Sequence, residues 1–580
     1  MTPARASVSR SFWLTLGIVL APAPAVAQDT AAPPASPWVA SIQAEIERAK
    51  SLELPGMPRP HHIVVTVLGE DESFVEATLG AIVKQDQDRA RALKVEVRVG
   101  DPTFDSSNFF GTAEEPIVVV PAPIEDDTTA LRRTLWLAVD SAYKSATETY
   151  EAKRAHKEAM AREQDRLADF TTAPVERFRA APVSGLPPIA TYAALARTAS
   201  AVFAKHPGVH RSLVRIVAQT RTRTLVDSAG TTIEDGTALL RVEIVARTQA
   251  EDGMVLADHV SFATRRLDDL PTEDVLVRRA EELATRLDRM REAAVVQDYA
   301  GPVLFEGHAA PQLFRYLFAD ELSATPPPEP SAGTEGATSF LSTRIDWRVL
   351  PLGFDVTDDP TVDRMADLPL LGSYGFDDQG VRAQSVRLVE DGVLKALLSS
   401  RTPSKSVALS NGHGRAGVMG DARGRAANLW VRSRAGLSAT AMRAKLLELA
   451  RKEGLDHGIV VTGLDEPAWT DHAMPVEGRG GGGVVLPRPT EAYRVGAGGK
   501  VELVRGVSLH GLRPRDLRHI LAAGREVSAY SYWASASPVR AAGNFGGEIP
   551  TTIVAPSVLL PDVDVMAPVP PHPLPPLAPR

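Results

Sequence analysis

The absence of cysteine limits the chemistry that this 580-residue chain can perform. Without a thiol there can be no disulfide, no thiolate zinc ligand and no cysteine nucleophile. A metal site would have to use His, Asp or Glu, and covalent catalysis would need Ser, Thr, Lys or a carboxylate. The sequence contains no HExxH, HExxxH or GxSxG pattern. The common metallopeptidase and serine-hydrolase motifs are therefore missing in their ordinary form.

The strongest candidate for a binding segment is residues 410–415, with the sequence SNGHGR. Glycines flank His413 on both sides, so we expect this segment to expose the side chains of His413 and Arg415. An imidazole and a guanidinium can both bind a carboxylate or a peptide carbonyl. The pattern predicts that these two residues contact a substrate.

Two further segments invite a functional interpretation. Residues 477–484 (EGRGGGGV) are rich in glycine but lack the Lys-Ser/Thr pair of a phosphate-binding loop. They predict either the rim of a peptide-binding cleft, with Gly480 and Gly481 beside the peptide, or a plain surface loop. Asp377 and Asp378 could form an acid–base pair, but neighbouring acids next to glycine are more typical of a turn. We expect these two carboxylates to stabilise a turn.

One pair of histidines has the spacing of metal ligands on a helix. His206 and His210 are four residues apart, but Pro207 and Gly208 lie between them and would interrupt a helix. No glutamate lies between them that could serve as a general base. We therefore do not expect a metal site there.

Hydrophobic periodicity indicates the elements that must position these residues. Amphipathic helices are expected near residues 38–46, 140–170, 273–294 and 439–453, and strands at 63–68, 240–244 and 459–462. Asp391-Gly392 separates two apolar runs, which predicts a hairpin over residues 385–398. Residues 493–504 form a second expected hairpin around several glycines. These elements predict an α+β fold with antiparallel hairpins in the C-terminal half.

A change in composition near Gly301 suggests two unlike domains of mixed helix and strand. We expect an N-terminal domain at residues 36–300 and a C-terminal domain, richer in glycine and short strands, at 301–560. Residues 561–580 are rich in proline and predict an extended tail, either a spacer or a docking peptide.

The first 27 residues have the pattern of a secretory signal peptide. Arg5 and Arg10 precede the apolar run 12–20, and residues 25–27 (AVA) offer a cleavage site. The apolar run is too short to span a bilayer of about 30 Å, although a retained anchor is the alternative. We expect a periplasmic or secreted protein with no membrane span after cleavage. Its net charge of −8 argues against nucleic-acid binding.

The order of several blocks along the chain resembles the TldD/PmbA (TldD/TldE) metallopeptidase-like family. No single block is specific, but together they occur in the order found in that family. The resemblance implies a two-domain α+β fold with a closing helix and strand near the end of the chain. The blocks are DSAGTT at 227–232, GHAA at 307–310, GSYGFDDQGV at 372–381, VEDGVLKALLSSR at 389–401, SNGHGR at 410–415, VRGVSLHGLRPRDLRHILAAG at 504–524 and IVAPSVLLPDVDV at 553–565.

The chain departs from that family at its zinc motif. Catalytic members carry HExxxH shortly after the Gly-x-Ala-Ala block, and those positions fall here on Arg315, Tyr316 and Asp320. An arginine stays protonated and cannot bind zinc, and the cysteine ligand of catalytic members is also missing. In this respect the chain is similar to the PmbA/TldE branch, which lacks the motif and pairs with a metal-bearing TldD-type subunit. On a helix around residues 313–318, Arg315 could bind a peptide carboxylate or form an ion pair with Asp320.

Three functional hypotheses follow. The first is an exported, non-catalytic, peptide-binding subunit that needs no cofactor and works with a TldD-type partner or as a homodimer. The second is an active metallopeptidase whose zinc is held by rearranged ligands drawn from His308, His413, Asp320 and Glu306. The third is a scaffold protein of the cell envelope whose tail at 561–580 docks a partner. We favour the first, because all but one of the ligand residues of the motif are replaced.

Overall fold

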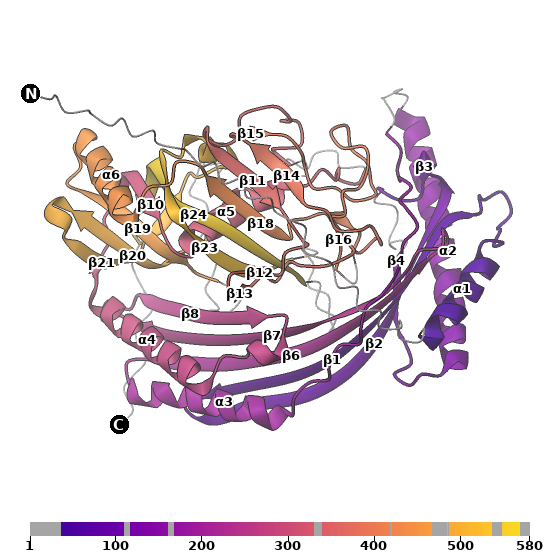
Figure 1. Ribbon diagram of the computed structural model, residues 1–580, viewed down its shortest axis with the longest axis horizontal. Helices are drawn as coiled ribbons and strands as arrows, with labels where there is room; N and C mark the ends of the chain where they lie inside the picture. Colours follow the sequence, from indigo (N-terminus) through magenta and orange to yellow (C-terminus); the bar gives the residue numbers. More distant parts are fainter. Residues whose placement is uncertain are drawn as a thin grey trace, which may run out of the picture. The chain divides into compact units, whose positions relative to one another are not determined.

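Long antiparallel strands organise the first half of the chain in the computed structural model (Figure 1). The structure describes residues 36–109, 117–160, 167–329, 339–417, 420–466, 484, 486–535 and 548–568. Eight strands form the first sheet in the order β3-β2-β1-β6-β7-β5, with β4 beside β2 and β8 beside β7. Their bounds are β1 Pro60–Thr78, β2 Ala81–Asp101, β3 Phe104–Asp105, β4 Ile117–Pro121, β5 Arg177–Arg179, β6 Arg211–Asp227, β7 Thr232–Gln249 and β8 Val255–Thr264.

Side-chain alternation separates the two faces of this sheet. Near the start of β1, Val65 and Val67 pack into one apolar cluster with α1 and α2. Further along the same strand, Val75 and Ala77 pack with α3 and α4. These residues are an even number of positions apart, so they lie on one face, and the four helices cover that face. The helices are α1 Pro37–Ala49, α2 Thr128–Met160, α3 Ile189–Ala201 and α4 Glu273–Glu292, with the short 3₁₀ turns η1 Val202–Lys205 and η2 Leu267–Asp269.

The second half of the chain is built around the strand β24, which runs through Glu548–Met566. β24 pairs with β18 through residues 552–554 and with β10 through residues 558–565, and β23 and β22 pair with its opposite edge. The full order of this sheet is β15-β14-β11-β18-β24-β10-β19-β20-β21-β9. The bounds are β9 Ala294–Val295, β10 Tyr299–Phe305, β11 Phe354–Asp358, β14 Val386–Glu390, β15 Val393–Leu394, β18 Asn428–Ser433, β19 His457–Leu464, β20 Pro489–Gly496, β21 Val501–Arg505, β22 Ser508–His510 and β23 Ala522–Ser535.

Two helices cover opposite faces of the second sheet. Val303 and Phe305 of β10 pack with α5, whereas Leu304 between them packs with α6. The period of two along the strand thus separates the α5 core from the α6 core. The helices are α5 Ala309–Leu317 and α6 Ala439–Lys452, with the 3₁₀ turns η3 Ala319–Leu322, η4 Ala497–Gly499 and η5 Pro514–His519. Two small hairpins complete the half: β12 Arg364–Met365 with β13 Leu368–Pro369, and β16 Gly414–Arg415 with β17 Arg423–Gly424.

Several predicted elements are confirmed, and with them the α+β class. The predicted hairpin at 385–398 turns at Asp391 and Gly392, whose φ angles are 49° and 79°. Ser438 caps α6 by accepting a hydrogen bond from the Ala441 N–H at 3.3 Å. Gly454, with φ of 76°, ends that helix region, as expected for a left-handed glycine after a helix.

Two expectations for the end of the chain are wrong. Residues 504–524 do not form a closing helix, because only the six-residue turn η5 lies between strands β22 and β23. The segment expected as a tail from residue 561 instead continues β24 as far as Met566. Pro561 fits this strand because the register with β10 shifts between Leu560 and Val563. A proline is tolerated at such a bulge, where it does not have to donate a ladder hydrogen bond.

No helix in the described ranges combines the length and the apolar character needed to cross a membrane.

Candidate functional site

Helix α5 carries Arg315 and Tyr316, two of the three positions that the family resemblance matches to the zinc motif. Leu313, Phe314 and Leu317 are fully buried in the core of the C-terminal half. With this face fixed, α5 leaves Arg315 and Tyr316 half-buried beside the strand β23.

The guanidinium of Arg315 lies in a cluster of charge and aromatic rings. Its Nη1 donates to Glu466 Oε2 at 2.6 Å, and the hydroxyl of Tyr530 donates to the same oxygen at 2.7 Å. The guanidinium carbon is 4.3 Å from the ring centre of Tyr532 and 4.8 Å from that of Tyr316. Such a position over an aromatic face stabilises the cation. We call these five residues the Arg315 cluster.

The partner of Arg315 is Glu466, not Asp320 as the sequence suggested. Asp320 lies on η3 with its side chain exposed. Burial opposes the charge on Arg315, but the neighbouring tyrosines and Glu466 raise the pKa of its guanidinium above the ordinary value. Arg315 is therefore a permanently charged member of a buried ion pair.

The residues at the three motif positions do not fit a zinc ion. A protonated guanidinium has no lone pair to offer, and Arg315 is already bonded to Glu466. Burial raises the pKa of the Tyr316 hydroxyl, so this phenol stays neutral. Of the three positions only Asp320 carries a conventional ligand group, and zinc sites need at least three protein ligands.

The rearranged ligand set is also engaged in other contacts. Glu306 forms an ion pair with Arg443 at 2.8 Å, and His413 bonds to Asp358. Across the ranges that the structure describes, no three His, Asp or Glu side chains come together as a possible metal site.

His413 is not exposed by its flanking glycines, so this expectation is corrected. Its side chain is fully buried, with Nε2 3.0 Å from Asp358 Oδ1 and Nδ1 3.0 Å from the Asn411 carbonyl oxygen. Gly412, with φ of 74°, passes so close to Arg382 that an added Cβ would lie 2.2 Å from the Arg382 carbonyl oxygen. A glycine is therefore needed where these two backbone segments cross closely, and the local backbone directs the His413 side chain into the interior.

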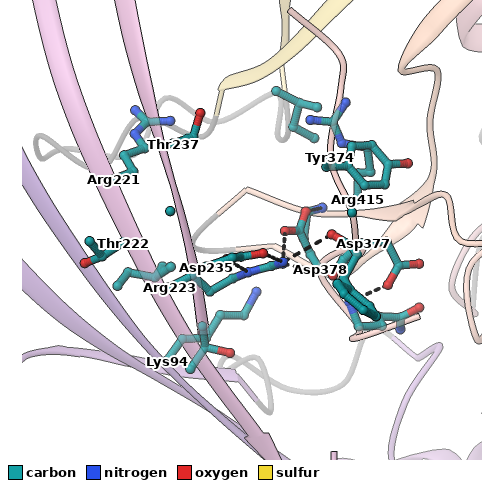
Figure 2. Close-up of a pocket in the computed structure, with 18 of the residues that line it drawn as sticks. Lys94, Arg221, Thr222, Arg223, Asp235, Thr237, Tyr374, Asp377, Asp378 and Arg415 are labelled. Atoms are coloured by element: carbon teal, nitrogen blue, oxygen red, sulfur yellow. Dashed lines mark hydrogen bonds and ion pairs between the residues drawn. The ribbon is translucent and has the colours of Figure 1, made fainter. Parts of the chain in front are cut away.

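Arg415, two residues further on, lines a cavity of about 420 Å³. The cavity lies between the helix-free face of the first sheet and the loops of the C-terminal half around residues 373–379 and 415–417. Figure 2 shows Arg221, Arg223 and Asp235 of the sheet across from Tyr374 and Arg415. We call this space the inter-sheet cavity. It brings together residues that are more than 150 positions apart in the sequence.

Asp377 and Asp378 form a turn at the wall of this cavity, as predicted. Oδ1 of Asp377 accepts hydrogen bonds from the backbone N–H groups of Gln379 and Val381, each at 2.9 Å. Burial raises the pKa of Asp377 to about 6, against the effect of these N–H donors. Asp378 instead contacts Arg223 of the first sheet at 3.2 Å. The turn thereby connects the two halves of the chain.

Arg223 is the main ion-pair centre of the cavity wall. Its Nη2 lies 2.6 Å from Asp235 Oδ2, and its Nη1 also donates to the Asp377 carbonyl oxygen at 2.9 Å. Burial opposes its charge, but Asp235 and Asp378 hold the pKa of Arg223 above the ordinary value. This residue was not anticipated from the sequence. The signal that could have found it is the alternation Arg221-Thr222-Arg223, which marks a charged strand face.

Gly480 and Gly481 of the predicted cleft rim lie outside the described residues, so the structure does not place them.

Comparison with known proteins supports the resemblance. Residues 298–567 match the sequence model of a family described as the PmbA/TldA metallopeptidase C-terminal domain. Two relatives named metalloprotease, from Archaeoglobus fulgidus and Methanothermobacter thermautotrophicus, are 40% identical over 89 residues and 35% identical over 83 residues. These alignments cover 15% and 14% of this chain, and they span only 17% of the length of each of these curated relatives.

Solved structures share the fold over most of the chain. TldE from Thermococcus kodakarensis superposes with a TM-score of 0.58 at 14% identity, covering 91% of this chain and all of TldE. A protein from Thermotoga maritima described as a modulator of DNA gyrase gives the same TM-score and coverages at 16% identity. A protein with the same description from Bacteroides thetaiotaomicron gives 0.54 at 12% identity, covering 91% of this chain and 98% of its own.

Proposed function

The chain belongs to the TldD/PmbA family, and we propose that it is a peptide-binding member that carries no catalytic zinc of its own. One observation supports this proposal: Arg315, at a position that the resemblance matches to a zinc-binding histidine, forms a largely buried ion pair with Glu466 at 2.6 Å. A divalent cation placed beside this guanidinium would meet like charge at short range. In a partly buried site such repulsion is screened only weakly.

A family member that holds no zinc could not cleave a peptide by the metal-dependent route, but it could still bind one. The inter-sheet cavity has the size of ordinary ligand sites, which span about 300–1,000 Å³. Its wall combines aromatic rings, such as Phe178 and Phe376, with charged groups. An extended peptide segment presents both apolar side chains and polar backbone groups, and this lining suits both.

We further propose that the protein acts outside the cytoplasm with a second subunit. The N-terminal pattern of residues 1–27 supports export. The likeness to TldE supports pairing with a zinc-bearing TldD-type chain, although a homodimer would also provide a second subunit. In this account the partner cleaves the peptide, and this chain holds it.

The proposal can be tested with the chain purified without its first 27 residues and immobilised. A tryptic digest of casein is passed over it, and the retained and released peptides are identified by mass spectrometry, with and without a chelator. We expect retained peptides of unchanged length in both conditions. Shortening of peptides that stops when the chelator is added would overturn the non-catalytic role, and a digest that passes unretained would overturn peptide binding.

A further inference from the structure

Two arginines in the inter-sheet cavity have only neutral hydrogen-bond partners among the described residues. Arg265 donates from Nη1 to the Leu371 carbonyl oxygen at 2.6 Å and from Nη2 to the Thr237 hydroxyl at 2.8 Å. Arg415 donates from Nη1 to the Pro550 carbonyl oxygen at 2.9 Å. Each guanidinium has five N–H donors, so both retain N–H groups that these bonds do not use.

Arg415 is held in place by its surroundings rather than by an acid. Its side chain is nearly buried, with 8% of the residue exposed. The guanidinium carbon lies 4.8 Å from the ring centre of Tyr374, and Nη1 also approaches the Ala426 carbonyl oxygen at 3.4 Å. A guanidinium fixed in this way is preorganised to bind a planar anion.

The carboxylates that line the same cavity are already matched by other groups. Asp235 and Asp378 bond to Arg223, and Glu70 bonds to Arg221 through Oε2 at 2.6 Å, whereas its buried Oε1 has no hydrogen-bond partner among the described residues. Glu96 pairs with Arg98 at 2.7 Å. Asp377 accepts backbone N–H groups, as described above. Each acid of the wall therefore has at least one bonding partner, and none of these acids forms an ion pair with Arg265 or Arg415 among the described residues.

The neighbouring lysine adds to this positive charge. Lys94 also lines the cavity, and its Nζ donates to the carbonyl oxygen of Gly420 at 2.9 Å. Burial, together with the charge of Arg415, lowers the pKa of Arg265 to about 10. Arg265 thus stays charged at neutral pH, although the positive charge of Arg415 opposes its own. Charges held in this way are stabilised by an anion that bonds to both.

We propose that Arg265 and Arg415 form a subsite for the C-terminal carboxylate of a short peptide in the inter-sheet cavity. A carboxylate offers two oxygens, each of which can accept an N–H from a guanidinium. Leu68 and Phe376 line the same cavity and would contact the last side chains of the peptide. The identity of the ligand as a peptide rests on the proposed function.

The test compares two versions of one peptide on the wild-type chain. The probe is an N-acetylated, fluorescently labelled pentapeptide without acidic side chains, prepared with a free C-terminal carboxylate and with a C-terminal amide. Binding is measured by fluorescence anisotropy. We expect the amide to bind at least ~10-fold more weakly, because each hydrogen bond to a charged group is worth about 1.5–3 kcal/mol, or roughly 10-fold and more in affinity.

Substitutions of the two arginines test whether these residues cause the preference for the free carboxylate. Arg265→Gln and Arg415→Gln should each weaken binding of the free acid and leave that of the amide nearly unchanged. Arg387→Gln, which removes an exposed arginine of β14 that pairs with Glu390, is the matched control and should preserve the difference.

Each outcome decides a separate point. Equal binding of the acid and the amide would overturn the carboxylate subsite and leave the proposed peptide binding standing. If both variants still bind the free-acid peptide more tightly than the amide, the carboxylate binds elsewhere. That result would also overturn the subsite. Failure of both peptides to bind would overturn peptide binding itself. The comparison on the wild-type chain does not depend on whether the variants fold.

Discussion

Buried arginines occur in two contrasting settings in this protein. In the Arg315 cluster the guanidinium is matched by the carboxylate of Glu466 and covered by tyrosine rings. In the inter-sheet cavity, Arg265 and Arg415 bond to carbonyl and hydroxyl oxygens and carry no described carboxylate partner. The first setting is a complete ion pair at a position that the family resemblance matches to the zinc motif. The second leaves charge available for a ligand.

The contrast teaches that residue type alone does not distinguish a structural arginine from a binding one. The difference lies in whether a buried charge has a counter-charge within the chain. Removing one partner of a matched pair should lower the free energy of unfolding strongly. Removing an unmatched charge should change the free energy of unfolding little but weaken ligand binding strongly.

The largest effect is expected from Glu466→Gln. This substitution leaves Arg315 charged and without its carboxylate, so the free energy of unfolding should fall by about 3 kcal/mol. The measurement is urea unfolding followed by circular dichroism. Glu502→Gln is the control, because it breaks a more exposed pair with Arg494 and should lower the free energy of unfolding much less. If both variants lose the same small amount, the Arg315 pair does not stabilise the fold as described.

A second substitution should restore part of that loss. Combining Arg315→Met with Glu466→Gln removes both charges, so no uncompensated ion remains in the core. We expect the double variant to recover at least half of the loss, with a coupling energy of about 1–3 kcal/mol in a double-mutant cycle. Strictly additive effects would show that the two residues do not act as a pair.

The cavity arginines should behave in the opposite way. Arg265→Gln or Arg415→Gln removes a charge that no described acid balances, while glutamine can keep one of the hydrogen bonds. We expect the free energy of unfolding to change by less than ~1 kcal/mol. A loss as large as that of Glu466→Gln would mean that these arginines are structural and would remove the contrast.

The smallest expected effect is a change in the stability of the fold with pH. It comes from His206, which forms ion pairs only when its ring is protonated. Burial opposes the charge of His206, but its hydrogen bonds with Asp288 and Glu281 raise its pKa above the ordinary histidine value of about 6.5. Protonated His206 therefore stabilises the fold fully below pH about 6.5, and this stabilisation is lost as the pH rises through the folded-state pKa.

The measurement is the urea midpoint of wild-type and His206→Gln protein between pH 5.5 and 8.5. The difference between the two should shrink as the pH rises. Asp288→Asn, which removes one of the two acids, should show a smaller shrinkage. A difference that is constant across this range would contradict the pairing.

Local signals predicted much of the fold. Ser438 and Gly454 mark the two ends of α6 because capping depends on neighbouring residues. Asp391-Gly392 fixes its hairpin for the same reason. The long hairpin of β1 and β2 was only partly foreseen. Residues 84–91 of β2 are polar and largely exposed, so their side chains show no alternation, and the turn at Leu79-Gly80 lacks the usual Asn or Asp.

The candidate site could be predicted only in part. Arg415 was identified from its segment, and it does line the inter-sheet cavity. Arg265 was not, because its proximity to Arg415 depends on the packing of two sheets, which no short pattern encodes. His413 was expected to be exposed, since the sequence does not show that Gly412 crosses another backbone. The pairing of Arg315 with Glu466 likewise joins residues 151 positions apart.

The central claim is that the Arg315–Glu466 pair occupies the place where catalytic relatives hold zinc. The most direct test is to grow crystals of the chain without its first 27 residues in the presence of added zinc and to record anomalous diffraction at the zinc edge. We predict no anomalous peak within bonding distance of Glu466, Tyr316 or Asp320 and an intact ion pair. A strong peak there, with Arg315 displaced from Glu466, would contradict the account.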